Sequence, residues 1–168
     1  MSLSKTIIIL LAGIIAIAID LIILQLILKK VKKNAESESK LKISFAIWFS
    51  TLFFALSIIN YQSISFLNEA IDNIYKINPP NIIKETAKAI SLFSGLGVVW
   101  FVIWFYISNV FAVLVVGKRK DSNEMESDNH TYFLIKGFIT IGFIIALMPI
   151  FVSLIRTFIP SIEIPFYH

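Results

Sequence analysis

Four long apolar stretches, separated by short polar segments, dominate the pattern of hydrophobic and polar residues along the chain. They cover about residues 7–28, 43–60, 89–116 and 132–155. A helix needs roughly 20 apolar residues to cross a bilayer, and each stretch meets or approaches that length. The first and third stretches lack the polar face that a water-soluble helix repeats every 3.6 residues. The pattern therefore predicts four transmembrane helices.

A membrane-spanning β-barrel is the alternative, because only helices and closed barrels satisfy their backbone in lipid. Barrel strands alternate apolar and polar residues, and the run IIILLAGIIAIAI in the first stretch does not alternate. We therefore predict an all-α integral membrane protein. Residues 1–168 are expected to form a single domain of four helices in two hairpins, because the segments between the stretches are too short for a soluble domain.

The segment between the second and third stretches predicts an amphipathic helix over about residues 64–77. Its apolar residues recur at helical spacing: Ile64, Leu67, Ile71, Ile74 and Tyr75. The sequence Asn78-Pro79-Pro80-Asn81 then breaks any helix. Residues 82–116 predict one helix of about 50 Å, which exceeds a bilayer of about 30 Å. Either helices two and three extend outward as a hairpin, or the amphipathic segment lies on the outer surface.

Lysine and arginine set the expected orientation. Segments 29–42 and 117–131 together hold nine of them. The opposite side holds Lys5, Lys76, Lys84 and Lys88, with Arg156 at the boundary. Since cytoplasmic loops carry the excess of positive charge, we expect these two loops in the cytoplasm and both termini outside. The abundance of Ile, Lys, Asn and Phe is typical of an AT-rich bacterial genome, so we expect a multi-pass protein of the bacterial inner membrane.

Each apolar stretch carries a polar residue at a similar distance from its inner end. Asp20 and Asn109 lie nine positions before the lysines that begin the inner loops, and Thr51 and Thr140 lie eight positions into their helices. Helix rise places all four at a depth of roughly 12–14 Å. Lys136 lies one turn below Thr140. These five residues predict a polar layer inside the membrane and a candidate ion site.

Asp20 is the residue on which the interpretation of this layer depends. In a structural role it is neutral, or is paired with Lys136 or Asn109, and only holds helices together. In a functional role it is the titrating carboxylate of an ion or proton site, because charges at this depth usually face a bundle interior or water. The lack of a second acidic neighbour favours the structural role. In an oligomer, one Asp20 per subunit would instead form a ring around a pore.

Catalytic, metal-binding and cofactor-binding residues are not predicted. The chain has no cysteine, and its two histidines are His130, in a polar segment, and His168. No nucleophile, zinc or phosphate-loop motif is present, so we expect no enzyme and no cofactor. The net charge of +4 does not indicate nucleic-acid binding, because the positive residues flank the apolar stretches.

Three classes of function remain. The first is a membrane subunit that oligomerises or scaffolds a larger complex, with lipid, a second copy or other membrane subunits as its partners. The second is a homo-oligomeric channel or pore around Asp20, and the third is a small transporter. Stripes of small and polar residues, such as Ser50, Ser57 and Asn60 in the second stretch, predict helix association. We therefore favour the first class.

Overall fold

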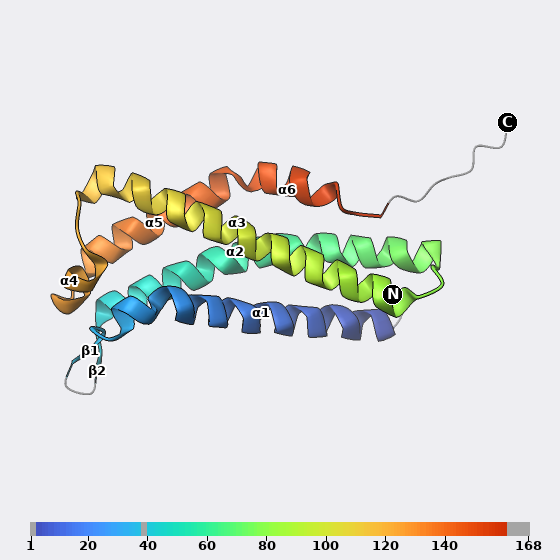
Figure 1. The fold of residues 1–168 in the computed structure, drawn as a ribbon, viewed down its shortest axis with the longest axis horizontal. Helices are drawn as coiled ribbons and strands as arrows, with labels where there is room; N and C mark the ends of the chain where they lie inside the picture. Colours follow the sequence, from blue (N-terminus) through green and yellow to red (C-terminus); the bar gives the residue numbers. More distant parts are fainter. Residues whose placement is uncertain (1–2, 38–39, 161–168) are drawn as a thin grey trace.

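A computed structural model describes residues 3–37 and 40–160, and in it long helices run along one common axis (Figure 1). The elements in chain order are α1 (Leu3–Lys32), β1 (Glu36–Ser37), β2 (Lys40–Leu41), α2 (Ile43–Ile77), α3 (Ile82–Val116), α4 (Asp121–Glu126), α5 (His130–Ala146) and α6 (Met148–Arg156). The strands have two residues each and pair antiparallel between α1 and α2. We call the end of the bundle that carries these strands and α4 the inner end, and the opposite end the outer end.

The prediction of a helical protein is confirmed, and its long helices have the length and apolar composition that crossing a membrane requires. Three of them, α1, α2 and α3, are long and apolar enough to cross a membrane. The pair α5 and α6 supplies a fourth segment if the two are taken as one span, bent by 44°. Pro149 lies at the start of α6, where a proline lacks the N–H that a continuous helix needs. The bend therefore falls beside a residue that interrupts a helix.

The turn between α2 and α3 follows from its asparagines and prolines. Asn78 adopts the left-handed conformation (φ 51°) and donates its N–H to the carbonyl of Ile74, which ends α2. Pro79 and Pro80 follow, and the side chain of Asn81 then accepts a hydrogen bond from the Lys84 N–H and caps α3. The amphipathic segment 64–77 is thus part of α2, which runs without a break to Ile77.

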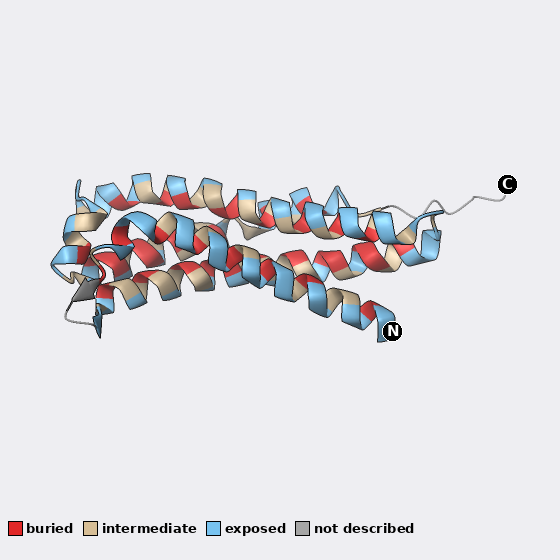
Figure 2. Ribbon diagram, turned by 60° about the horizontal axis from the view of Figure 1, so that its bottom comes forward, coloured by how far each residue is buried: buried red, intermediate tan, exposed pale blue. Residues whose placement is uncertain are grey.

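α2 is the central helix, packed against α1, α3 and α5. Trp48 shows how it joins its neighbours, since its ring lies 6.2 Å from that of Phe105 in α3 and 5.7 Å from that of Phe133 in α5. In lipid such contacts stabilise a bundle through close packing, because apolar side chains gain no transfer energy there. The buried residues of α2 accordingly follow its whole length, as Figure 2 shows.

α1 is the peripheral helix. It buries one narrow face, whose members are spaced mostly four residues apart: Lys5, Ala12, Ala16, Asp20, Leu24, Leu28 and Val31. The small residues Ala12 and Ala16 let α1 approach closely. The other sides of α1 are apolar and exposed in the isolated chain (Figure 2).

Candidate functional site

Asp20 is paired with Asn60 across the contact between α1 and α2. The Asn60 side-chain amide donates to the Asp20 carboxylate, and only 3% of Asp20 is exposed. Asp20 therefore does not pair with Lys136 or Asn109, the two partners expected from the sequence. The sequence places Asn60 in a polar stripe but does not identify it as the partner of this carboxylate.

A second polar contact joins α3 and α5. The hydroxyls of Ser108 and Thr140 lie 2.9 Å apart, and Thr140 also donates to the Lys136 carbonyl in its own helix. Thr51 lies against the same part of α5, because a Cβ built on Gly137 would fall 2.6 Å from the Thr51 hydroxyl oxygen. The threonine hydroxyl itself donates back to the carbonyl of Ile47. This group is held by close helix packing, with hydrogen bonds within each helix and between α3 and α5.

The Asp20–Asn60 pair and the polar contacts around Thr140 do not lie at one depth in the bundle. Asn60 lies nine positions beyond Thr51 in α2, which is about 13 Å along the helix. Asp20 is therefore placed about that much farther from the inner end than the threonines. The prediction of a single polar depth shared by Asp20, Thr51 and Thr140 does not describe the structure.

Lys136 reaches toward the inner end. Its ammonium group lies 2.7 Å from both carboxylate oxygens of Asp121 at the start of α4, and the Tyr132 hydroxyl donates to the same carboxylate. The ammonium also lies 5.1 Å from the centre of the Trp48 ring, within range of a cation–π interaction. The long lysine stem is thus buried while its charge leaves the apolar region, as snorkelling predicts.

Asn109 is placed near the same end of α3. Its side-chain oxygen is buried and has no hydrogen-bond partner among the described residues. A buried polar atom without a partner costs about 1–3 kcal/mol, so such an atom is expected to meet a donor from outside the chain, such as water or a ligand. Of the five predicted site residues, Asn109 is the one left open to an external group.

The two inner loops cap each other's helices. Asp128 accepts a hydrogen bond from the Ser44 N–H in the first turn of α2, where the helix dipole stabilises a negative charge. In return, the Lys42 ammonium binds the carbonyls of Met125 and Glu126 at the end of α4, at 3.1 and 2.9 Å. We call this arrangement the inner cap. The sequence did not predict α4 or the contacts between the loops.

The inner cap is expected to weaken in acid. The side chain of Ser44 and then its backbone N–H stabilise the Asp128 carboxylate and hold its pKa below the usual 3.8. A carboxyl group with a lowered folded pKa contributes stability in full above the unfolded value, and the contribution is lost as the pH falls toward the folded value. Asp128→Asn should remove this part of the acid dependence. Pepsin cleavage of segment 117–131, followed from about pH 5 down to about pH 2, measures it.

Glu126→Gln is the matched control for Asp128→Asn, because it removes one charge from the same segment and keeps the backbone carbonyl that Lys42 binds. We expect the control to keep the acid-dependent cleavage of the parent chain. Equal acid dependence in the parent and in Asp128→Asn would show that the contact with Ser44 does not stabilise the cap.

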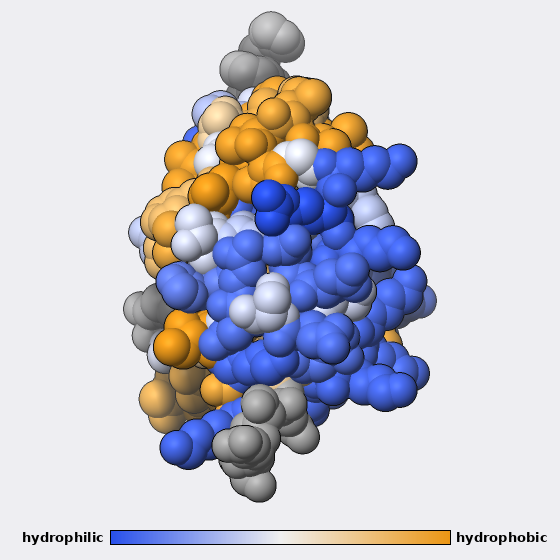
Figure 3. All heavy atoms as spheres, turned by 90° about the vertical axis from the view of Figure 1, so that its left-hand side faces the viewer, coloured by the Kyte–Doolittle hydropathy of each residue, from blue (hydrophilic) through white to orange (hydrophobic). Residues whose placement is uncertain are grey.

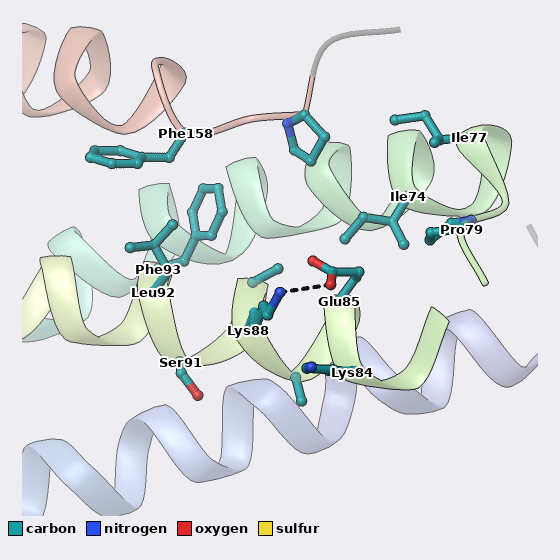
Figure 4. A pocket seen from close by; sticks show the side chains of 13 residues that line it. Ile74, Ile77, Pro79, Lys84, Glu85, Lys88, Ser91, Leu92, Phe93 and Phe158 are labelled. Carbon is teal, nitrogen blue, oxygen red and sulfur yellow. Dashed lines mark hydrogen bonds and ion pairs between the residues drawn. The ribbon is translucent and has the colours of Figure 1, made fainter. Parts of the chain in front are cut away.

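The outer end holds an ion pair and an apolar hollow. Lys5 of α1 forms a salt bridge with Asp72 of α2. The hollow, about 980 Å³, lies between α2, α3 and the segment after α6 (Figure 4). Its wall includes Phe93 and Phe158, and a Lys88–Glu85 ion pair of 2.7 Å lies beside it. The hollow offers few polar groups to position a reacting substrate. Among the described residues, no three His, Asp or Glu side chains gather as metal ligands would.

Comparison with family models, with curated proteins and with solved structures finds no match to this chain. Its function is therefore inferred from its own residues and contacts.

Proposed function

We propose that this protein is a non-enzymatic, membrane-embedded subunit that associates through the outer halves of α1 and α2, with a second copy or with another membrane chain. The supporting observation is that these two helix segments lie side by side and expose surfaces of opposite polarity.

The register of α1 against α2 is set by contacts along their length. Lys5 pairs with Asp72, and a Cβ built on Gly13 would lie 3.6 Å from the end of the Ile64 side chain. Asp20 then pairs with Asn60. Residues 5–20 of α1 therefore run antiparallel to residues 60–72 of α2, at the same height in the bundle.

At this height the surface of α1 is apolar and that of α2 is polar. Leu10 and Leu11 are 63% and 52% exposed, while Ser65 and Glu69 are exposed on the neighbouring helix. Lipid suits the leucines but penalises a carboxylate, and water suits the carboxylate but not a broad apolar face. No single surrounding medium satisfies both surfaces. A partner that covers one of them resolves the conflict wherever the membrane boundary lies.

An unsatisfied amide supports the same surface. The side-chain oxygen of Asn68 is buried and lacks a hydrogen-bond partner among the described residues. Asn68 lines a shallow hollow of about 320 Å³ between α1 and α2, together with Ile9, Tyr61 and Ser65. A partner side chain that enters this hollow would supply the missing hydrogen bond.

The proposed orientation places the inner end in the cytoplasm and both termini outside, in the bacterial inner membrane. It is supported by the concentration of lysine and arginine in segments 29–42 and 117–131. Figure 3 looks onto the inner end and shows a broad hydrophilic surface with apolar residues along its margin, as expected of a bundle end that meets water.

Crosslinking in native membranes tests the proposed association. The chain has no cysteine, so single cysteines can be introduced without removing any. We expect Leu11→Cys or Glu69→Cys, labelled with a benzophenone maleimide and irradiated, to form crosslinks to a second chain, because benzophenone reacts with any C–H bond beside it. Phe138→Cys is the control, because Phe138 is also exposed but lies on α5, which packs mainly on α2 and α3. Yields at both positions no higher than at Phe138 would contradict the proposal.

A pore or transporter centred on Asp20 is the alternative function. It requires Asp20 to face a water-filled path or a ring of subunits. The burial of Asp20 against Asn60 within one chain instead supports a structural role for this carboxylate.

A further inference from the structure

A crevice opens at the inner end, between α1 and α3. Its volume is about 700 Å³, and its apolar wall includes Leu26 and Ile27 from α1 and Phe105 and Tyr106 from α3. The α3–α4 linker, the start of α4 and Lys136 line the crevice at the inner end of the bundle. The crevice thus has an apolar part toward the middle of the bundle and a polar part at the inner end. We call it the inner crevice.

The polar part of the inner crevice is strongly positive. It is lined by four cations, Lys30, Arg119, Lys120 and Lys136, and by one carboxylate, Asp121. Asp121 is already engaged by Lys136. The side-chain ammonium groups of Lys30 and Lys120 have no ion-pair or hydrogen-bond partner among the described residues, so both charges can meet an anion.

Arg119 and Asn109 add groups that can accept further contacts. The Arg119 guanidinium contacts Glu124 at 3.3 Å and the Val116 carbonyl, which leaves several of its five N–H donors unused. Asn109 also lines the inner crevice, and its buried side-chain oxygen is the one without a partner. Unused hydrogen-bond donors of Arg119 and an unpaired acceptor of Asn109 therefore line a space that the chain itself does not fill.

We propose that the inner crevice binds one anionic phospholipid. Lys30, Arg119 and Lys120 contact its phosphate, and an acyl chain follows the apolar wall between α1 and α3. The chemistry fits because basic pockets between membrane helices on the cytoplasmic side recognise anionic headgroups. The apolar wall adjoins the positive part of the crevice, just as the acyl chains of a phospholipid adjoin its charged headgroup. The crevice and the proposed association surface occupy opposite ends of α1, so each can be tested alone.

Native mass spectrometry of the full chain, released from nanodiscs of phosphatidylglycerol and phosphatidylcholine, tests the proposal. We expect the parent chain to retain one phosphatidylglycerol in preference to phosphatidylcholine. The double variant Lys30→Gln/Lys120→Gln should retain it roughly 10- to 30-fold less tightly, because each surface lysine contributes substantially to binding anionic lipid. Equal retention of the two lipids by the parent chain would overturn the proposal.

Two further variants separate a seated lipid from general attraction to a positive surface. Lys40→Gln/Lys118→Gln removes the same charge from the inner end at exposed positions outside the inner crevice, and should retain phosphatidylglycerol as the parent does. Leu26→Trp keeps every charge but places a larger side chain in the space beside the apolar wall, so this variant should no longer retain phosphatidylglycerol. If the charge control loses as much as Lys30→Gln/Lys120→Gln, or if Leu26→Trp loses nothing, the lipid is not seated in the crevice and the proposal is wrong.

Discussion

Gly137→Ala is expected to destabilise the bundle, by about 1–3 kcal/mol relative to the matched variant Gly142→Ala. The added methyl group would lie within 2.6–2.9 Å of three atoms of the Thr51 side chain, so α2 and α5 would have to separate. The same methyl at Gly142 in the same helix meets nothing within 4 Å. There it should gain up to about 1 kcal/mol from helix propensity. Thermal or denaturant unfolding in detergent micelles measures the difference.

A compensating change tests whether Thr51 is the cause. In Gly137→Ala/Thr51→Gly the side chain that meets the new methyl is removed, so part of the lost stability should return despite the glycine placed in α2. A favourable coupling energy in this double-mutant cycle would assign the loss to the contact of these two residues. If Gly137→Ala unfolds at the same denaturant concentration as Gly142→Ala, α2 and α5 are not as close as the structure has them.

Asp20→Leu is expected to weaken the contact of α1 with α2, whereas Asp20→Asn should be nearly neutral. Leucine leaves the Asn60 amide without its acceptor, and a buried amide without a partner costs about 1–3 kcal/mol. Asparagine keeps an acceptor oxygen of similar position and removes only the charge. A disulfide-trapping rate between cysteines placed at Lys5 and Asp72 measures how firmly α1 is docked on α2.

The same two variants separate the structural role of Asp20 from an ion site. If the carboxylate only holds helices together, Asp20→Asn should leave any activity of the protein in liposomes unchanged. If proton or cation flux is found in liposomes and Asp20→Asn abolishes it while α1 stays docked, Asp20 is a transport residue and the alternative function applies. Equal docking of Asp20→Leu and the parent would show that the pair with Asn60 has no structural weight.

The long helices could be predicted from the sequence because each depends on local features. Apolar length predicts α1 and α3, the residues Asn78 to Asn81 end one helix and begin the next, and Pro149 predicts the bend before α6. These signals act through the backbone and through solvation, and both operate on contiguous residues.

The partners of the polar residues could not be predicted in the same way. The predicted depth of Asp20 depends on Lys29 as the end of the first helix, and that of Thr51 on the start of the second stretch. In the structure α1 continues to Lys32, and the first turn of α2 belongs to the inner cap through Ser44. The starting levels of the helices therefore differ, and Asp20 meets Asn60. Lys136 binds Asp121 because α4 folds within a segment expected to be a loop. Such contacts depend on how separate segments pack, which no local pattern records.

The most direct test of the proposed association is the mass of the protein ejected from native membrane vesicles into a mass spectrometer, without detergent. The chain alone has a mass of 19.1 kDa. We expect particles that hold at least two chains, either two copies or one copy with another membrane protein. Leu11→Trp and Glu69→Trp should shift them toward the single chain. Particles of one 19.1 kDa chain with lipid alone, at every protein density in the membrane, would contradict the proposed association.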